Sequence, residues 1–253
     1  MFYRNIPETP RALLVFTPEE SKRLIAAAVV QMTEVRSALK KGRIIIASGS
    51  TNAYIIAELS GTMDDLERRM VGRIFKGKLD AVPPEMRLEP VVLIDGKISD
   101  RPYPEVLEEF TAGDVFIKGA NAVDPAGNVG VLAGNPQGGT VGKFWALVRA
   151  RGARHICPVG LEKLIPSVEK AVEESGQEWF SYSIGLKASL MPLPGALVVT
   201  EIEALRILYD LEATHIASGG VMGSEGSVVL SVKGEKPNID RMWGEIQSYK
   251  NRE

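Results

Sequence analysis

A short polar corner follows the first strongly apolar stretch of this 253-residue chain. Residues 43–47 read Arg-Ile-Ile-Ile-Ala, which is typical of a strand covered on both faces, and residues 48–52 read Ser-Gly-Ser-Thr-Asn. Glycine allows a tight turn there, while hydroxyls and the first N–H groups of a following helix can bind an anion, most simply a phosphate. The expected phosphate-binding residues are Gly49, Ser50, Thr51 and Asn52. In the alternative, Ser50 or Thr51 only caps the helix.

Seven glycines fall within the 26 residues from Lys118 to Lys143. Regular structure rarely tolerates that density, because each glycine raises the entropy lost on folding, so we expect a backbone that approaches a ligand closely. A second anion site would consist of Gly138, Gly139 and Thr140, with Lys143 one turn into the next helix. Other residues expected to face the ligand are Gly119, Asn121, Asp124 and Asn128. Asp124 can equally serve only to form a turn over 124–127.

A third glycine-rich corner, residues 218–227, holds Glu225 between two apolar segments. A carboxylate at a sheet end can act as a base or as a covalent nucleophile, provided that neighbours such as Met222 modify its ionisation. Gly220 would line the ligand site from the same corner. The catalytic candidates are therefore Glu225, Asp124 and Lys143. A solvated loop is the alternative reading of this corner.

Other nucleotide-binding and hydrolase motifs are missing. The chain has no G-x-x-x-x-G-K-[ST], its first corner lacks G-x-G-x-x-G, and residues 223–227 do not form a G-x-S-x-G elbow. Only two histidines are present, and we expect both His155 and His215 at the surface or at a strand edge, so we expect no metal site and no Ser/His/Asp triad. The single cysteine, Cys157, is expected to be buried and inert.

The elements that position these corners alternate between strands and helices. A helix is predicted from a capping box at Thr17 and Glu20, through apolar residues at helical spacing, to a stop at residues 40–42. Further alternation predicts a mostly parallel sheet flanked by helices. Asp95 and Gly96 predict a hairpin that leaves the main sheet. We expect one α/β domain over 1–253, with an N-terminal helical segment at 1–42 and a small hairpin insertion at about 71–100.

Composition narrows the class of protein. Hydrophobic residues make up 45% of the chain, which is ordinary for a globular domain. The formal net charge of −2 and the pI near 5.9 leave no basic excess for binding nucleic acid. No segment approaches the roughly 18 uninterrupted apolar residues of a membrane span, and the first residues are not those of a secretory signal. We therefore expect a cytoplasmic protein without nucleic-acid or membrane partners.

Taken together, the three corners resemble the NagB/RpiA/CoA transferase-like superfamily, whose α/β members include sugar-phosphate isomerases, CoA transferases, folate cyclo-ligases and ligand-sensing domains. Residues 47–59 resemble the phosphate-binding corner and helix of ribose-5-phosphate isomerase. Residues 114–132 resemble its strand ending in G-A-D-x-[IV]-D, and 138–143 its second glycine loop. The similarity runs from about residue 43 to 232, and residues 158–171 also resemble the lactate-utilisation branch.

The resemblance implies a Rossmann-like fold, a homo-oligomer and a phosphorylated small-molecule ligand, either a sugar phosphate or CoA as a substrate, with no bound cofactor. Asn121 and Ala122 stand where the isomerase has an acidic pair, and only Asp124 is kept. CoA transferases form a thioester on a glutamate, whose counterpart here would be Glu225. Three possibilities stay open: a sugar-phosphate isomerase-like enzyme, acyl transfer through Glu225, and a non-catalytic metabolite sensor or assembly subunit.

Overall fold

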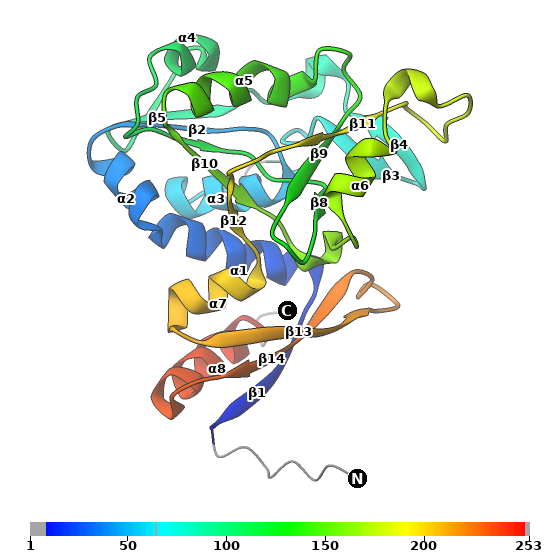
Figure 1. Ribbon diagram of the computed structural model, residues 1–253. Helices are drawn as coiled ribbons and strands as arrows, with labels where there is room; N and C mark the ends of the chain where they lie inside the picture. The colour runs from blue at the N-terminus through cyan, green and yellow to red at the C-terminus, as the bar shows by residue number, and fades with distance from the viewer. Residues whose placement is uncertain (1–8, 64, 251–253) are drawn as a thin grey trace.

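The computed structural model describes residues 9–63 and 65–250 and is built around a six-stranded central sheet (Figure 1). Its strands, in spatial order, are β12 (Leu197–Val199), β10 (Arg154–Pro158), β7 (Val115–Ile117), β2 (Arg43–Ile46), β5 (Val91–Ile94) and β6 (Lys97–Ser99). The first four run parallel, and β5 and β6 run antiparallel to their neighbours. The predicted α/β class with a mostly parallel central sheet is confirmed at this level.

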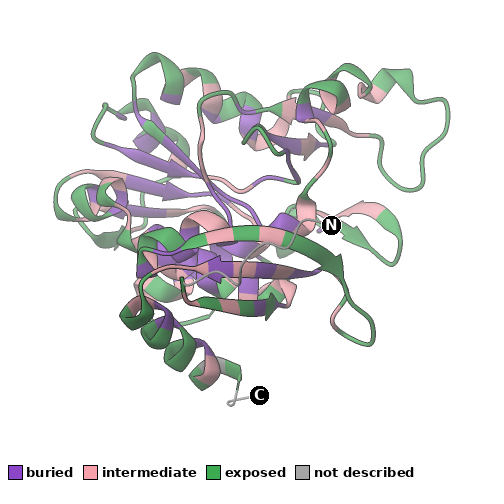
Figure 2. Ribbon diagram, turned by 60° about the horizontal axis from the view of Figure 1, so that its bottom comes forward, coloured by how far each residue is buried: buried purple, intermediate pink, exposed green. Residues whose placement is uncertain are grey.

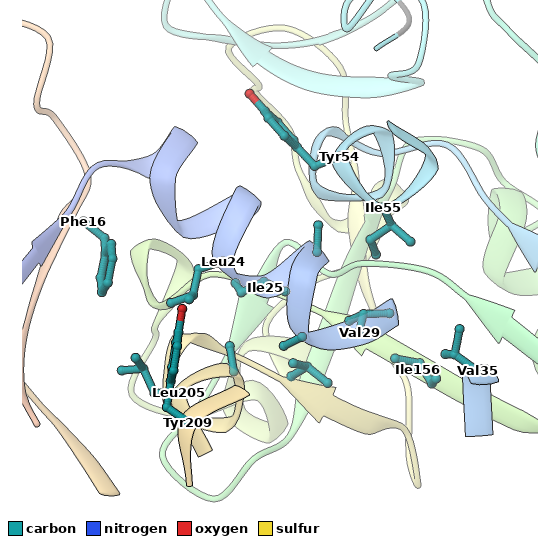
Figure 3. Packing of buried hydrophobic residues seen from close by; sticks show 14 of the residues in the cluster. Phe16, Leu24, Ile25, Val29, Val35, Tyr54, Ile55, Ile156, Leu205 and Tyr209 are labelled. Carbon is teal, nitrogen blue, oxygen red and sulfur yellow. The ribbon is translucent and has the colours of Figure 1, made fainter. Parts of the chain in front are cut away.

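Helices cover both faces of the central sheet. Successive residues of β2 divide between two cores, because Ile44 and Ile46 belong to one cluster and Ile45 to the other. The first core holds α1 (Pro18–Gln31), α3 (Ser50–Ser60) and α7 (Glu201–Tyr209), and the second holds α4 (Tyr103–Glu108) and α5 (Gly139–Ala150). Figure 3 shows part of the first core, where the side chains of Leu24 and Ile25 on α1 lie near Leu205 and Tyr209 on α7.

The helix predicted from Thr17 to residue 39 is broken at Met32. Its start is confirmed: Thr17 Oγ1 accepts from the Glu20 amide at 3.3 Å, and the Glu20 carboxylate accepts from the Thr17 amide at 2.8 Å. Met32 is extended (φ −59°, ψ 141°), and α2 (Thr33–Lys40) then starts in a new direction. Helical spacing continues across the break because Val35 and Ala38 of α2 are buried in the same core as α1.

A second, antiparallel sheet joins the two ends of the described chain. It consists of β1 (Arg11–Phe16), β14 (Ser227–Lys233) and β13 (Glu212–Gly219) in that order. The sequence predicts one mostly parallel sheet and does not indicate this separate antiparallel sheet, its strand β1 or the C-terminal helix α8 (Lys236–Lys250). Alternate residues Leu14, Phe16, Leu230 and Val232 are buried, and the opposite face, which carries Leu13, is exposed (Figure 2).

The hairpin predicted at Asp95 and Gly96 is present as β5 and β6, but it extends the central sheet, since β5 pairs with β2 along its length. A separate two-stranded hairpin is formed by β3 (Gly72–Phe75) and β4 (Lys78–Ala81).

The glycine-rich segment after β7 forms a third sheet. Its strands are β8 (Ala122–Val123), β9 (Val129–Ala133) and β11 (Ser189–Pro192).

The remaining elements are short. They are the helix α6 (Val168–Glu173) and the 3-10 turns η1 (Pro84–Met86), η2 (Leu161–Lys163) and η3 (Gln177–Trp179). Among the described residues, no helix combines the length and the apolarity that crossing a bilayer requires.

Candidate functional site

The parallel strands β2, β7, β10 and β12 end at one edge of the central sheet, which we call the carboxyl edge. Four segments leave the sheet there: residues 47–52 into α3, residues 118–121, residues 159–163 through η2, and residues 200–201 into α7. Ligands of open α/β sheets bind outside the carboxyl ends of the strands, where the following helices begin. The carboxyl edge is therefore the first place to look for a site.

The polar corner after β2 opens α3 without a side-chain cap. Gly49 is the N-cap residue, so Ser50 and Thr51 lie within the first helical turn, and the helix-cap alternative for these two residues is not what the structure shows. The Gly49 amide donates to the Arg69 carbonyl oxygen at 2.7 Å. Within the described part of the chain, the N–H groups of Ser50, Thr51 and Asn52 have no hydrogen-bond partner. These three donors and the positive end of the helix dipole favour an anion.

Asn52 connects α3 to the ends of two strands. Its side chain is 1% exposed, and its Nδ2 donates to the carbonyl oxygens of Ala47 at 2.7 Å and of Ile117 at 3.3 Å. Its Oδ1 is buried and has no partner among the described atoms. Buried acceptors are normally hydrogen-bonded, so this oxygen calls for a donor such as a ligand hydroxyl or a water. Gly119 lies opposite, where an added Cβ would be 3.9 Å from Asn52 Oδ1.

Lys118, which sequence analysis did not single out, lies directly after β7 at the carboxyl edge. The side chain is half-buried, and its Nζ donates only to the Gly119 carbonyl oxygen, at 3.3 Å. No carboxylate of the described residues lies within ion-pair distance of this ammonium. Burial lowers its pKa to about 8, and the nearby charge of Lys163 contributes in the same direction. A lysine between a buried strand and a glycine was the signal available in the sequence.

Glu201 is the second residue that sequence analysis missed at this edge. It is fully buried at the start of α7, where one carboxylate oxygen accepts from the Leu161 amide at 2.9 Å and the other has no partner among the described atoms. Burial raises its pKa and outweighs the hydrogen bond from the Leu161 amide, which favours the charged form. Close by on η2, Lys163 pairs with Glu162 at 3.4 Å. The carboxyl edge thus combines unpaired acceptors with cationic side chains.

The Asp124 carboxylate accepts hydrogen bonds mainly from the turn that it begins. Its Oδ1 accepts from the amides of Ala126 at 3.0 Å and Asn128 at 2.9 Å. Its Oδ2 accepts from Asn128 Nδ2 and from the Val168 amide, both at 3.0 Å. Burial alone would raise the pKa of Asp124, but these hydrogen bonds outweigh it and lower the pKa. The turn and the start of α6 together account for these four hydrogen bonds to the carboxylate. Asn121 is likewise used in structure, since its Oδ1 accepts from the Leu132 amide at 3.0 Å.

The Gly138–Thr140 corner belongs to a different part of the surface. It opens α5, which packs on the face of the sheet opposite to α3. Gly138 borders an open hollow of about 570 Å³ together with Gln137, Trp179 and Met191, and no residue of 48–52 lines that hollow. Lys143 is exposed on α5. This hollow is therefore not shared with the α3 corner.

Glu225 lies in the exposed loop between β13 and β14, with Gly220 at the start of the same loop. Its carboxylate accepts from the Gly223 amide at 2.8 Å, and backbone hydrogen bonds within the loop lower its pKa. Met222 is 96% exposed and supplies no apolar cover. The base of the loop approaches the carboxyl edge, because a Cβ at Gly226 would lie 3.4 Å from Glu162 Oε2.

The predicted surface position of His155 is wrong. His155 is 3% exposed within β10, and burial lowers its pKa to about 4. Its Nε2 lies 3.2 Å from the Lys118 carbonyl oxygen, which can only accept, so Nε2 carries the hydrogen. His215, on β13, is half-buried and contacts Ser218 Oγ at 2.7 Å. Cys157 is buried as predicted, and burial raises its pKa to about 12.

No family model, curated protein or solved structure matches this chain. The case for a function therefore rests on the geometry of the carboxyl edge.

Proposed function

We propose that the carboxyl edge around the start of α3 binds a phosphorylated small molecule, either a sugar phosphate or the phosphate-bearing part of CoA. The observation that carries the proposal is the first turn of α3, where, among the described residues, neither the N–H groups of residues 50–52 nor Asn52 Oδ1 has a hydrogen-bond partner. The N–H groups suit phosphate oxygens, and Lys118 and Lys163 add positive charge at the same edge.

Asn52 narrows the ligand class. Its Nδ2 is committed to two backbone carbonyls, so Oδ1 can only receive a hydrogen bond. A phosphate ester with a neighbouring hydroxyl satisfies both halves of the site, whereas inorganic phosphate satisfies only the amides. This favours a sugar phosphate over a bare anion. The mostly parallel sheet followed by an uncapped helix at this corner also supports membership of the NagB/RpiA/CoA transferase-like superfamily, which we propose on the same grounds.

A non-catalytic binding role is the second candidate. Asp124 is fully engaged in its turn, and Glu225 lies in an exposed loop rather than at α3. Neither carboxylate that the sequence offers as a base is placed at the proposed phosphate site. Binding without turnover is the function that this arrangement supports.

Titration calorimetry with ribose 5-phosphate, CoA and inorganic phosphate tests the proposal. Ser50→Ala combined with Thr51→Ala removes two hydroxyls from the first turn of α3 and is expected to weaken ribose 5-phosphate binding about tenfold, at roughly 0.5–1.5 kcal/mol for each hydrogen bond. Ser60→Ala, at the other end of the same helix, is the matched control and should leave affinity unchanged. Equal affinity of the double variant and the parent protein would contradict the proposal.

A further inference from the structure

We propose that Lys118 is an amine nucleophile, which forms an imine with a carbonyl group of the phosphorylated ligand. The inference rests on the proposed function, since the phosphate site at α3 is what would bring the carbonyl compound to this edge. It adds a chemical class to the ligand, a phosphorylated aldehyde or ketone, and a covalent step to the site.

The position of Lys118 in the fold supports this role. It follows β7, whose neighbours β2 and β10 both run parallel to it, so it stands between the ends of two other strands. Among the described residues, its Nζ donates only to the carbonyl oxygen of Gly119, at 3.3 Å. The adjoining Gly119 lies against Asn52, the residue that presents the unpartnered acceptor. The amine and the proposed phosphate site therefore belong to neighbouring strand ends.

The surroundings of Lys118 increase the fraction of neutral amine relative to an exposed lysine. The charged and titratable groups that act on it are Cys157 and His155 on β10 and Lys163 on η2. His155 and Cys157 are buried in their neutral forms at pH 7, and Lys163 repels a second positive charge. Structural lysines that lose solvent normally gain a carboxylate partner, and no such partner lies within reach among the described residues.

The backbone at Lys118 is also fixed. The Lys118 amide donates to the Ile156 carbonyl oxygen at 3.0 Å, and its own carbonyl oxygen accepts from His155 Nε2 at 3.2 Å. Phe144 packs edge-on against the His155 ring, at 5.1 Å between ring centroids, and holds it in place. A nucleophile carried on a rigid strand end is positioned more precisely than one carried on a mobile loop.

The step balances without any oxidant or reductant. The neutral Nζ attacks the carbonyl carbon, so that a C–N bond forms and the C=O π bond breaks, and one Nζ proton passes to the carbonyl oxygen. The carbinolamine then loses its hydroxyl and the second Nζ proton as water, which breaks the C–O bond and leaves a C=N bond to Nζ. Hydrolysis by the reverse path restores the free lysine and the carbonyl compound.

Reductive trapping tests the inference. The full-length protein is incubated at pH 7.5 with D-glyceraldehyde 3-phosphate and sodium cyanoborohydride, and the secondary amine is located by peptide mass mapping. Labelling of Lys118 is expected to be at least about tenfold faster than labelling of Lys41, an exposed lysine at the amino end of β2, because an ordinary lysine is almost entirely protonated at this pH. Lys118→Arg should abolish the fast label, and Lys41→Arg should retain it.

Glycerol 3-phosphate, which has the phosphate but no carbonyl, separates the two proposals. If it binds by calorimetry and slows the labelling of Lys118, both are supported. If it binds while Lys118 labels no faster than Lys41, the imine inference is overturned and the phosphate site stands. A third outcome is that glycerol 3-phosphate does not bind and that Lys118 is labelled as fast by unphosphorylated glyceraldehyde as by glyceraldehyde 3-phosphate. In that case the nucleophile stands and the proposed function falls. Peptide mass mapping of the parent protein compares Lys118 with Lys41 directly, so it tests the imine inference even if Lys118→Arg fails to fold.

Discussion

Gly119 lies so close to Pro158 that a Cβ at position 119 would be 2.9 Å from the Pro158 carbonyl oxygen. The contact joins the ends of β7 and β10 at the carboxyl edge. Because the obstacle is backbone, it cannot rotate away, and any larger residue has to push the two strand ends apart. Asn52 reaches the same edge from β2, where its Nδ2 donates to the Ala47 and Ile117 carbonyl oxygens.

Gly119→Ala is therefore expected to lower the free energy of unfolding by about 1–3 kcal/mol and to weaken binding of ribose 5-phosphate. Urea unfolding and calorimetry on the same preparation provide the two measurements. Gly72→Ala is the matched control, because no atom lies within 4 Å of the added methyl group, and it should change stability by less than about 0.5 kcal/mol. Equal stability of the two variants would show that the strand ends are not closely packed.

Asp124→Asn is expected to destabilise the protein by about 1–3 kcal/mol at pH 7, because the new NH₂ group would face donors that now bind the carboxylate. The folded protein lowers the pKa of Asp124, so the carboxylate stabilises the fold above the usual aspartate range near pH 4, and this stability is lost as the pH falls through the lowered pKa. The difference between the variant and the parent protein should shrink toward pH 3.

Urea unfolding at a series of pH values measures this difference. Asp240→Asn, which alters an exposed aspartate paired with Lys236, is the control and should cost less than about 0.5 kcal/mol. A difference for Asp124→Asn that stays constant from pH 7 to pH 3 would mean that its charge does not stabilise the turn.

Glu201→Gln should show the opposite pH trend. Burial raises the pKa of Glu201, so the folded protein binds a proton here more tightly than the unfolded chain does. The carboxylate therefore costs stability as the pH rises above the usual glutamate range near pH 4. The stability of the variant relative to the parent should increase between pH 4 and pH 8, as measured by thermal unfolding. Glu58→Gln, which alters an exposed side chain on α3, is the control. A relative stability that falls with pH would contradict the assigned direction.

Phe144→Ala is expected to lower the free energy of unfolding by about 3–5 kcal/mol. Its ring stacks on Phe116 with 4.0 Å between centroids, and both side chains are fully buried between α5 and the central sheet. Tyr182→Ala, at a position that is 93% exposed, should change stability by less than about 0.5 kcal/mol. Chemical denaturation of both variants gives the comparison. A small loss for Phe144→Ala would mean that the core on this face collapses into the space left by the ring.

Local patterns predicted much of the architecture. The run of isoleucines in β2, the capping box at Thr17 and the glycine corner before α3 all appear in the structure, because each depends on residues close in sequence. Which sheet a strand joins depends on distant partners, and so the separate sheet in which β14 pairs with β1, from the other end of the described chain, was not predicted. The break at Met32 escaped detection because helical spacing continues across it.

The sequence by itself determined the class of the fold and the polar corner at Gly49, Ser50 and Thr51, since strand and helix periodicity and turn chemistry are short-range properties. Only the tertiary structure decided which polar groups are left without partners. Asp124 looks equally available in the sequence but is satisfied by Asn128 and Val168. Among the described residues, by contrast, Lys118 Nζ has no carboxylate partner and Asn52 Oδ1 has no hydrogen-bond donor. Hydrogen-bond satisfaction depends on what packs around a group, and that is fixed only when distant strands are brought side by side.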